Sequence, residues 1–244
     1  MLTDYHCHIL PEIDDGAENR EISEKMLDMM KMNGVGRIVL TPHFYPHREI
    51  SVEDFLQKRN TAFEKISGRS EFEFYCGAEV AVERGLSEIS GIEKLRIDGT
   101  DFILLELPFS GYGQWVLNEV HNLTCHTKLV PVFAHIHRYM KIYSKSQLSE
   151  ILDTKAVFQV NAEALSDFRK RRFVKKLISS GAKVVFGSDS HNLTNRKPNF
   201  DLLRRKAKPE WILFSDMFFE TKLYETTFSR VAEEDTGLTD KQKD

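Results

Sequence analysis

The feature that most constrains the fold is a repeated alternation of short apolar runs with amphipathic stretches. The apolar runs are rich in β-branched and aromatic residues, as is typical of strands buried in a parallel sheet. They cover Leu2–Tyr5, Arg37–Thr41, Phe72–Cys76, Phe102–Leu105, Leu129–Ala134, Ala156–Val160 and Lys183–Phe186. Strand–helix alternation at this spacing indicates βαβ units. Seven strands in one domain favour a closed or nearly closed α/β barrel, with an open doubly wound sheet as the main alternative.

The stretches between the runs have sequence signals for helices. Apolar residues recur every four positions over residues 22–30, and the Asn-Gly pair at residues 33–34 supplies a stop. Residues 51–66 begin with a Ser that has Asp three positions later, and residues 144–152 begin with Ser and Gln at the same spacing. A fourth helix is expected over residues 173–178, before a glycine.

Length and composition limit the classes of protein. The 244 residues suit one barrel domain, which we expect to occupy residues 1–232, with residues 233–244 as a polar, disordered tail. The chain has 34 basic and 37 acidic residues, a formal net charge of −3, which gives no strong case for binding nucleic acid or an anionic membrane. With 29% charged and 11% aromatic residues, the chain is not of the intrinsically disordered class.

Cysteine usage and the amino terminus indicate a cytoplasmic protein. Cys7, Cys76 and Cys125 are widely spaced and form neither a disulfide framework nor a CxxC metal motif. The first residues lack a basic segment followed by an apolar one, so we expect no signal peptide. No window approaches eighteen unbroken apolar residues, so no membrane-spanning segment is predicted.

Metal-competent side chains follow six of the seven predicted strands at their carboxyl ends. They are His6 and His8, then His43, Glu79, Glu106 and His135, and finally Asp189 and His191. In a parallel barrel all carboxyl ends of the strands open on one face, and active sites form there. We therefore expect side chains spread over nearly the whole chain to converge in one pocket.

The spacing of these residues strengthens the prediction of a metal site. His6 and His8 are two apart, so on a strand both imidazoles point to the same side, and Cys7 between them points away into packing. Imidazole and carboxylate ligands without thiolate suit divalent Mn, Fe or Zn. Several such ligands in one pocket allow a multinuclear cluster, in which paired metals bind an attacking hydroxide and a leaving phosphate oxygen together.

Other histidines have weaker positional support. His47, His121 and His126 lack a strand-end position and are expected to be structural. His137 lies two residues beyond His135 and is either a further site residue or part of the rim. A lone histidine is more often a packed or surface residue than a ligand.

Nucleophilic catalysis by cysteine or serine is not supported. No cysteine is followed, after five intervening residues, by the arginine that a cysteine phosphatase loop requires. The chain has no G-x-S-x-G elbow, and no G-x-G-x-x-G follows a predicted strand.

Ordered motifs from the amino terminus to about residue 200 resemble those of a known superfamily. The opening motifs are Asp4-Tyr5-His6-Cys7-His8-Ile9-Leu10-Pro11 and Ile13-Asp14-Asp15-Gly16-Ala17. Later motifs are Thr41-Pro42-His43-Phe44, Gly77-Ala78-Glu79-Val80, Glu106-Leu107-Pro108, Ala134-His135-Ile136-His137-Arg138-Tyr139, and Ser188-Asp189-Ser190-His191-Asn192-Leu193 followed by Arg196. The chain resembles the PHP (polymerase and histidinol phosphatase) superfamily. More narrowly, it resembles the CpsB-type bacterial metal-dependent protein tyrosine phosphatases of capsule and exopolysaccharide clusters.

This resemblance implies a distorted (β/α)7 barrel that holds three divalent metal ions, usually Mn, with Fe or Zn as alternatives. The implied ligands are His6, His8, Glu79 and Asp189 for the first metal, Glu79, Glu106 and His135 for the second, and Asp14, His43 and His191 for the third. Arg138 and Arg196 match the phosphate-binding arginines of the family. Without the resemblance, Asp14 is equally well explained as a helix-start residue.

The chain departs from the family pattern at two positions. The family usually has Gly where this chain has Glu12, which affects the loop that carries Asp14. It often has Glu where this chain has His137, so no role is carried over to that position.

The resemblance also implies an activity. We expect direct hydrolysis of phosphotyrosine by a metal-bound hydroxide, without a phosphoenzyme, on a membrane-associated tyrosine autokinase that controls polysaccharide export. One alternative is a small-molecule phosphomonoesterase, such as a histidinol-phosphatase-like enzyme. A non-catalytic, metal-holding scaffold is a second alternative. A nuclease is disfavoured by the near-neutral charge.

Two surface features bear on substrate choice. Phe44 and Tyr45, with the loop to Glu49, either form one wall for a phosphotyrosine peptide or pack the loop. The basic run Arg169–Arg172 either receives an acidic or phosphorylated partner or is a solvated helix face.

Overall fold

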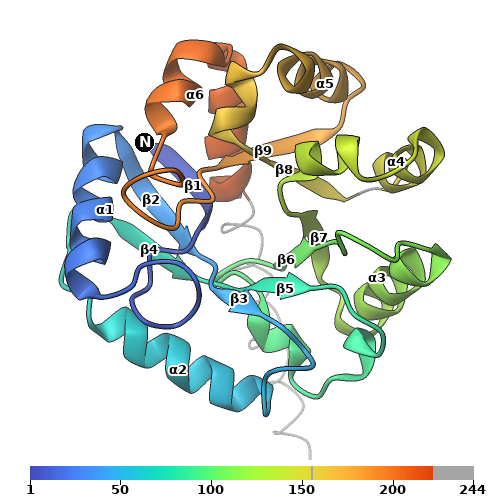
Figure 1. Ribbon diagram of the computed structural model, residues 1–244, viewed down its shortest axis with the longest axis horizontal. Helices are drawn as coiled ribbons and strands as arrows, with labels where there is room; N and C mark the ends of the chain where they lie inside the picture. Colours follow the sequence, from blue (N-terminus) through green and yellow to red (C-terminus); the bar gives the residue numbers. More distant parts are fainter. Residues whose placement is uncertain (155, 222–244) are drawn as a thin grey trace, which may run out of the picture.

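The structure, a computed structural model, describes residues 1–154 and 156–221 (Figure 1). All seven apolar runs contain strands. These are β1 (Leu2–Cys7), β2 (Val35–Leu40), β4 (Glu73–Cys76), β6 (Phe102–Glu106), β7 (Val130–Phe133), β8 (Val157–Asn161) and β9 (Lys183–Gly187). Two short strands, β3 (His43–Phe44) and β5 (Glu79–Ala81), were not expected, because each has only two or three residues.

The strands form a closed ring. Hydrogen bonds join β1, β2 and β4 into one sheet and β3, β5, β6, β7, β8 and β9 into another, and every pairing is parallel. β3 continues the direction of β2 and β5 that of β4, so each pair occupies one position of the ring. The ring closes where His8 N donates to Ser190 O at 2.9 Å and Asp189 N donates to His6 O at 2.7 Å. The predicted seven-position barrel is confirmed, and the open sheet is excluded (Figure 1).

Helices surround the ring in the positions that βαβ units require. They are α1 (Arg20–Met32), α2 (Val52–Glu64), α3 (Gln114–Thr127), α4 (Lys145–Leu152), α5 (Phe168–Ser179) and α6 (Phe200–Lys206). Short 3-10 turns lie at η1 (Leu86–Glu88), η2 (Ile92–Leu95), η3 (Ile136–Lys141) and η4 (Ala162–Ser166). Ser51 caps α2, and Ser144 with Gln147 forms a capping box at α4, as their spacing predicted. Helix α3 was not predicted, since its N-cap is Gly113, which has no capping side chain.

The barrel interior changes character along its axis. The inward residues of β6 are Phe102 and Leu104, followed on the same side by Glu106, whereas Ile103 and Leu105 pack outward in a separate cluster. The interior is therefore apolar near the amino ends of the strands and polar near their carboxyl ends. The polar side chains of the interior, which are the ones able to act as ligands or catalysts, therefore lie at one mouth of the barrel.

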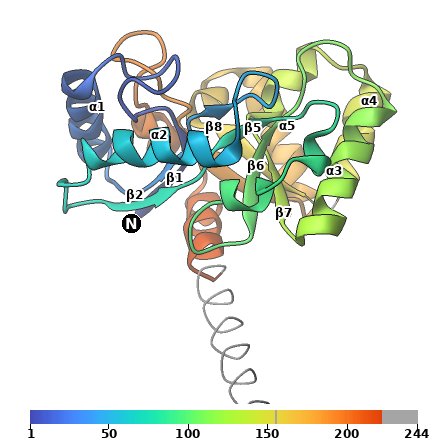
Figure 2. The same ribbon diagram turned by 90° about the horizontal axis from the view of Figure 1, so that it is seen from below.

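A helix over residues 209–221 closes the opposite mouth (Figure 2). The Phe219 ring is fully buried and packs edge-on against Tyr5 and Tyr75, at centroid distances of 5.3 and 4.9 Å. The Tyr5 hydroxyl donates to Ser215 O at 2.9 Å. The predicted domain boundary at residue 232 and the predicted tail over residues 233–244 lie outside the described residues.

Candidate metal centre

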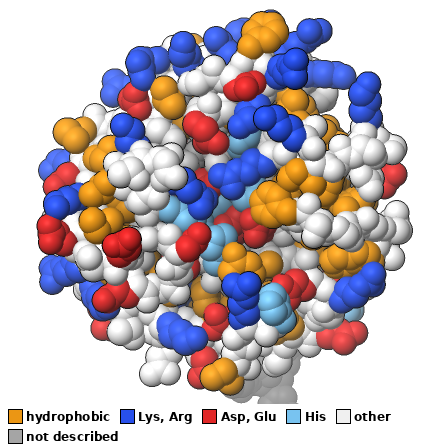
Figure 3. Space-filling model, in the orientation of Figure 1, with side chains coloured by type: hydrophobic (Ala, Val, Ile, Leu, Met, Phe, Trp, Pro, Cys, Tyr) orange, Lys and Arg blue, Asp and Glu red, His pale blue; other side chains and the backbone are white. Residues whose placement is uncertain are grey.

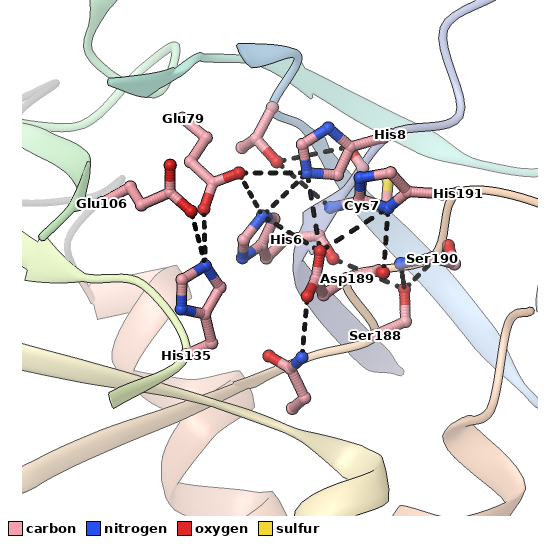
Figure 4. A network of polar contacts seen from close by, with 12 residues as sticks. His6, Cys7, His8, Glu79, Glu106, His135, Ser188, Asp189, Ser190 and His191 are labelled. Atoms are coloured by element: carbon pink, nitrogen blue, oxygen red, sulfur yellow. Dashed lines mark hydrogen bonds and ion pairs between the residues drawn. The ribbon is translucent and has the colours of Figure 1, made fainter. Parts of the chain in front are cut away.

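The carboxyl ends of the strands bring the predicted ligands together (Figure 4). They come from β1 (His6), the residue just after its end (His8), β3 (His43), β5 (Glu79), β6 (Glu106), the turn after β7 (His135) and the segment after β9 (Asp189, His191). Figure 3 shows histidines and acidic side chains in the hollow at the centre of this face, bordered by arginine and lysine. Side chains nearly 190 positions apart in the sequence therefore meet at one barrel mouth.

The first group of potential metal ligands combines residues from the first strand of the barrel with one that follows the last strand. The Nε2 atoms of His6 and His8 lie 3.1 and 3.2 Å from Glu79 Oε2. The same two atoms lie 3.7 and 3.6 Å from Asp189 Oδ1. These four residues are the set that the motifs implied for the first metal, and all are buried.

The second group shares Glu79 with the first. His135 Nε2 lies 2.9 Å from Glu79 Oε1 and 3.3 Å from Glu106 Oε1. The two carboxylate oxygens of Glu79 thus face different groups, as a bridging ligand requires.

The third group contains a different aspartate from the one expected. His43 Nε2 and His191 Nε2 each lie 3.4 Å from Asp15 Oδ1. Asp15, rather than Asp14, joins His8, His43 and His191 in a set whose potential ligand atoms lie within 4.8 Å of one another.

Asp14 instead holds His8 in place from the Nδ1 side of its ring. Its Oδ2 accepts hydrogen bonds from His8 Nδ1 at 2.7 Å and from the backbone N–H of His43 at 3.0 Å. In a neutral His8 this contact holds the proton on Nδ1 and leaves Nε2 to face the group, the usual arrangement behind a metal-bound imidazole. The adjacent Gly16 makes the turn possible, because a Cβ there would lie 2.1 Å from His8 O. The sequence could not separate two neighbouring aspartates on a loop of unknown direction.

The backbone is strained at several of these positions. His135 and Asp189 have φ angles of +32° and +52°, in the left-handed region that non-glycine residues rarely adopt. Glu12, where the family usually has Gly, has a φ of +63°. The loop therefore keeps a conformation that favours glycine despite the substitution.

Strand β8 contributes two residues that the sequence analysis missed. Gln159 Oε1 lies 3.1 Å from His6 Nδ1 and accepts from His135 N at 2.6 Å. Gln159 Nε2 donates to Asn161 Oδ1, and Asn161 Nδ2 donates to Asp189 Oδ2 at 2.9 Å. The signal was present as two polar residues at i and i+2 in an otherwise apolar strand. Both orient side chains of the first and second groups.

The electrostatics of the group follow from burial and close opposite charges. Burial raises the pKa of the Glu79 carboxyl, but the charge of His6, a hydrogen bond from His135 and the close approach of the His6 and His8 rings hold it well below its usual range. Burial lowers the pKa of His135, yet hydrogen bonds to Glu106 and Glu79 raise it to about 9. The carboxyl groups of the pocket are therefore kept in their ionised form, and positive charge beside them is needed to balance them.

Unsatisfied atoms indicate that a cation fits here. Glu79 Oε2 has the nitrogens His6 Nε2, His8 Nε2 and His43 Nδ1 at 3.1, 3.2 and 3.1 Å, but none is placed to form a hydrogen bond with it. His191 Nε2 is likewise buried without a hydrogen-bond partner. Converging imidazole nitrogens and carboxylate oxygens, several of them buried without a hydrogen-bond partner, are the arrangement of a metal site, and these ligand types suit Mn, Fe or Zn.

The two predicted arginines lie at the rim of the first group. Arg196 Nη2 donates to Asp189 Oδ1 at 2.7 Å, and Arg138 Nη2 donates to Asp189 Oδ2. About a third of each side chain is exposed, 33% for Arg196 and 30% for Arg138. Both guanidinium groups therefore face the solvent side of the buried cluster.

Two aromatic side chains flank the centre. Tyr45 stacks on His43 at 5.1 Å between ring centroids, whereas Phe44 packs against Phe55 in the core. On the other side Phe109, which is 46% exposed, stacks on His135 at 5.9 Å. Of the two aromatic residues in the expected wall, Tyr45 stacks on a histidine of the centre and Phe44 packs in the core, and Phe109 was not predicted because isolated aromatics are ordinary in sequences.

The remaining histidines lie outside the three groups. His121 and His126 are exposed on α3, and His47 pairs with Glu83 at the surface. His137 is buried, with Nε2 at 3.5 Å from Glu163 Oε1. Cys7 is buried and points to Val39 O, which confirms the orientation expected from strand alternation.

Together, the closed parallel barrel and its buried cluster of imidazoles and carboxylates define a barrel protein with a metal-type centre at the carboxyl ends of its strands. The sequence profile of a family described as capsular polysaccharide synthesis, CpsB/CapC, matches residues 2–209, and the chain belongs to this family. The family that the sequence motifs indicated is confirmed.

Relatives with curated descriptions cover most of the chain. The tyrosine-protein phosphatase CpsB of Streptococcus pneumoniae is 28% identical over 238 residues, which are 88% of this chain and 96% of the relative. The tyrosine-protein phosphatase YwqE of Bacillus subtilis (strain 168) is 24% identical over 204 residues, 80% of this chain and 79% of that protein.

A solved structure confirms the fold. It is described as "Crystal structures of YwqE from Bacillus subtilis and CpsB from Streptococcus pneumoniae, unique metal-dependent tyrosine phosphatases". The TM-score is 0.73 at 21% identity, over 91% of this chain and 94% of the other. Within the part of this chain that the structure describes, no helix has both the length and the apolar character needed to cross a bilayer.

Proposed function

We propose that this protein is a metal-dependent tyrosine-protein phosphatase that hydrolyses phosphotyrosine directly, without a phosphoenzyme. The observation that carries the proposal is the convergence of three imidazole nitrogens on Glu79 Oε2 beside two partly exposed arginines. The tyrosine-protein phosphatase names of the relatives support the same activity.

Three divalent metals, with Mn as the first choice and Fe or Zn as alternatives, would be held by three sets of residues. We assign His6, His8, Glu79 and Asp189 to the first metal, Glu79, Glu106 and His135 to the second, and Asp15, His43 and His191 to the third, with His8 also close to the third. When bound, such metals make hydroxide available at neutral pH and neutralise charge on phosphoryl oxygens.

The residues of the chain would then bind and orient the phosphate ester. Arg138 and Arg196 present planar, bidentate donors that match phosphoryl oxygens. Asp189 holds both guanidinium groups at the rim, so their positions are set before substrate arrives. A tyrosine phenolate has a pKa of about 10 and leaves without strong acid assistance.

The aromatic rim supports an aryl phosphate as substrate. Tyr45 and Phe109 stack on His43 and His135 on two sides of the centre, and each offers a ring face or edge to a phenyl group. We further propose that the natural substrate is a membrane-associated tyrosine autokinase of capsule or exopolysaccharide synthesis, met in the cytoplasm. The family description, capsular polysaccharide synthesis, supports that assignment.

The test combines metal analysis with kinetics. Purified protein is chelated, reloaded with Mn²⁺ and assayed on a phosphotyrosine peptide, alongside His6→Ala and the matched control His121→Ala on α3. We expect chelation and His6→Ala to abolish turnover and His121→Ala to change it less than about twofold. Turnover that survives chelation would contradict the proposal.

A comparison of substrates separates the alternatives. If kcat/KM is higher for a small aliphatic phosphate ester such as histidinol phosphate than for the peptide, the small-molecule phosphomonoesterase is correct. If metal is bound but no phosphomonoester is hydrolysed, the scaffold alternative is correct.

A further inference from the structure

The exposed surface of helix α5 has a strong positive charge that the proposed chemistry does not use. Arg169–Arg172, Lys175 and Lys176 give this helix six basic residues and no acidic one, although the whole chain has a net charge of −3. Figure 3 shows Lys and Arg side chains gathered over α5 on the face that carries the metal centre. Among the described residues, no carboxylate lies within ion-pair distance of Arg169–Arg172 or Lys175. We call these five residues, with Lys141 of η3, the α5 surface.

The α5 surface is hollowed on both sides of an exposed aromatic ring. One hollow, of about 460 Å³, is lined by residues 167–170 together with His137, Met140 and Lys141. The other, also about 460 Å³, is lined by Phe168, Arg171, Arg172, Lys175, Lys208 and Trp211. Phe168 lines both hollows and is 80% exposed, which is unusual for a large apolar side chain without a partner.

The acidic groups near the hollows are largely engaged. Asp167 Oδ1 caps α5 by accepting from the backbone N–H groups of Arg169 and Lys170 at 2.8 and 2.9 Å. Glu163 faces His137, and Glu210 lies 3.4 Å from Lys208. The second hollow is lined by four cations and no carboxylate, and Glu210 pairs only with Lys208, so an anionic occupant would balance the other three, which have no acidic partner among the described residues.

His137 at the first hollow is an independent sign of a ligand. It is 1% exposed, and neither ring nitrogen forms a hydrogen bond with a described residue. Glu163 Oε1 lies 3.5 Å from His137 Nε2. Buried polar groups are nearly always satisfied, so a hydrogen-bonding group of a bound molecule is the natural partner.

The α5 surface is continuous with the metal centre. The 3-10 turn η3 carries Arg138, which bonds Asp189, and three residues later Lys141, which lines the first hollow. In a 3-10 turn, residues at i and i+3 lie on the same side. A chain bound at Arg138 can therefore continue over Lys141 and Phe168 towards Arg171.

We propose that the α5 surface binds an acidic segment of the phosphoprotein, adjacent in sequence to the phosphotyrosine that enters the metal centre. This inference rests on the proposed phosphatase function and adds a determinant of substrate choice. Concave hollows on either side of one ring suit separate side chains of a peptide better than the plane of a bilayer. Electrostatic complementarity at such a rim acts chiefly on association and is sensitive to salt.

The test uses three phosphotyrosine peptides and two double variants of the full chain. One peptide has four acidic residues before the phosphotyrosine, one has four after it, and one has amides instead. The variant Arg171→Glu/Arg172→Glu reverses the charge of the second hollow. The matched control Arg20→Glu/Lys25→Glu reverses two exposed charges on α1, away from α5 (Figure 1).

We expect one acidic peptide to exceed the amide peptide by about tenfold in kcat/KM, mainly through KM, at low salt. The preference should disappear in roughly 0.5 M salt and in Arg171→Glu/Arg172→Glu, while the α1 variant keeps it. All three proteins should hydrolyse p-nitrophenyl phosphate, which is too small to reach α5, with the same kcat/KM within about twofold.

A second readout separates this inference from the proposed function. Fluorescence anisotropy measures binding of the unphosphorylated acidic peptide, which needs no turnover, and Arg171→Glu/Arg172→Glu should weaken it. Equal kcat/KM for all peptides, or a preference that survives the α5 substitutions, would overturn the inference. So would binding to phosphatidylserine vesicles without binding to the peptide. Absence of all hydrolysis with intact peptide binding would instead overturn only the phosphatase function.

Discussion

At the scale of single residues, two neighbouring aspartates take different positions in the same loop. Asp15 Oδ1 lies between His43 and His191, whereas Asp14 holds the Nδ1 side of His8. In the proposed assignment Asp15 is a metal ligand and Asp14 orients one, and these two roles differ in what their loss should do. Removal of a ligand opens the coordination of one metal, while removal of an orienting carboxylate weakens affinity by roughly 10- to 100-fold.

Amide substitutions distinguish the two aspartates. We expect Asp15→Asn to remove about one metal per chain and at least about 100-fold of kcat, because the third group loses its charged oxygen. Asp14→Asn should keep full metal content at saturating Mn²⁺ but need a higher concentration to reach it. Elemental analysis and a Mn²⁺ titration of activity measure both. The reverse pattern would restore Asp14 as the ligand.

Arg138 provides a second residue-scale prediction. Arg138→Ala should lower kcat/KM for phosphotyrosine by about 100-fold, since a guanidinium donor to the phosphoryl oxygens is lost, and leave metal content unchanged. Arg138→Lys should recover only part of the rate, because an ammonium cannot make the bidentate contact. Loss of metal in Arg138→Ala would assign the arginine to the support of Asp189 instead.

At the scale of elements, the ends of the barrel have separate roles. Strand β8 ends in Gln159 and Asn161, which position His6, His135 and Asp189 without joining the groups themselves. At the opposite end, the helix over residues 209–221 fills the interior with Phe219 and bonds Tyr5 through Ser215. We call this helix, with the buried Phe219 ring, the plug. The arrangement of polar residues at the other mouth depends on it, because water in the interior would weaken the packing that holds the strand ends in place.

The plug can be tested by truncating one ring. Phe219→Ala should lower the free energy of unfolding by about 3–5 kcal/mol, the usual cost of removing a buried Phe. Phe214→Ala is the matched control, since its ring is 45% exposed on the same helix, and should cost much less. Denaturant unfolding measures both. Equal destabilisation by the two substitutions would show that the interior does not depend on Phe219.

At the scale of the whole molecule, stability and metal binding are linked through protons. Burial lowers the pKa of His8, but the charge and hydrogen bond of Asp14 raise it to about 10, and hydrogen bonds to Glu106 and Glu79 raise the pKa of His135 to about 9. In the chelated protein, these imidazolium ions neutralise the carboxylates around them. Metal ions and protons therefore compete for the same nitrogens.

This competition predicts opposite dependences on pH. Since both pKa values exceed the ordinary value of about 6.5, the stabilisation of the chelated protein is complete below about pH 6.5 and is lost as pH rises towards the folded-state values. The Mn-loaded protein needs neutral imidazoles and should lose stability as pH falls. Thermal unfolding between about pH 6.5 and 9 should therefore give Tm values that fall for chelated protein and rise for loaded protein. Parallel curves would contradict the linkage.

How much the sequence could predict depended on the kind of signal. His6 and His8 were predictable because strand alternation fixes the relative direction of residues two apart. The barrel was predictable because each apolar run is long enough to be recognised as a buried strand. β3 and β5 were not, since two or three residues make no such run, and α3 lacks a capping side chain. The roles of Phe109 and Gln159 could be recognised only from the residues that lie beside them in the folded structure.

By itself, the sequence determined which residue types end each strand, and hence that imidazoles and carboxylates share one mouth of a parallel barrel. That much follows from local periodicity and the common direction of parallel strands. Only the tertiary structure placed Asp15 rather than Asp14 beside His43 and His191, brought Gln159 and Asn161 against the proposed ligands, and put Lys141 next to α5. Those choices depend on loop direction and on contacts between distant segments, such as the close approach of Gly16 to His8, which no local pattern encodes.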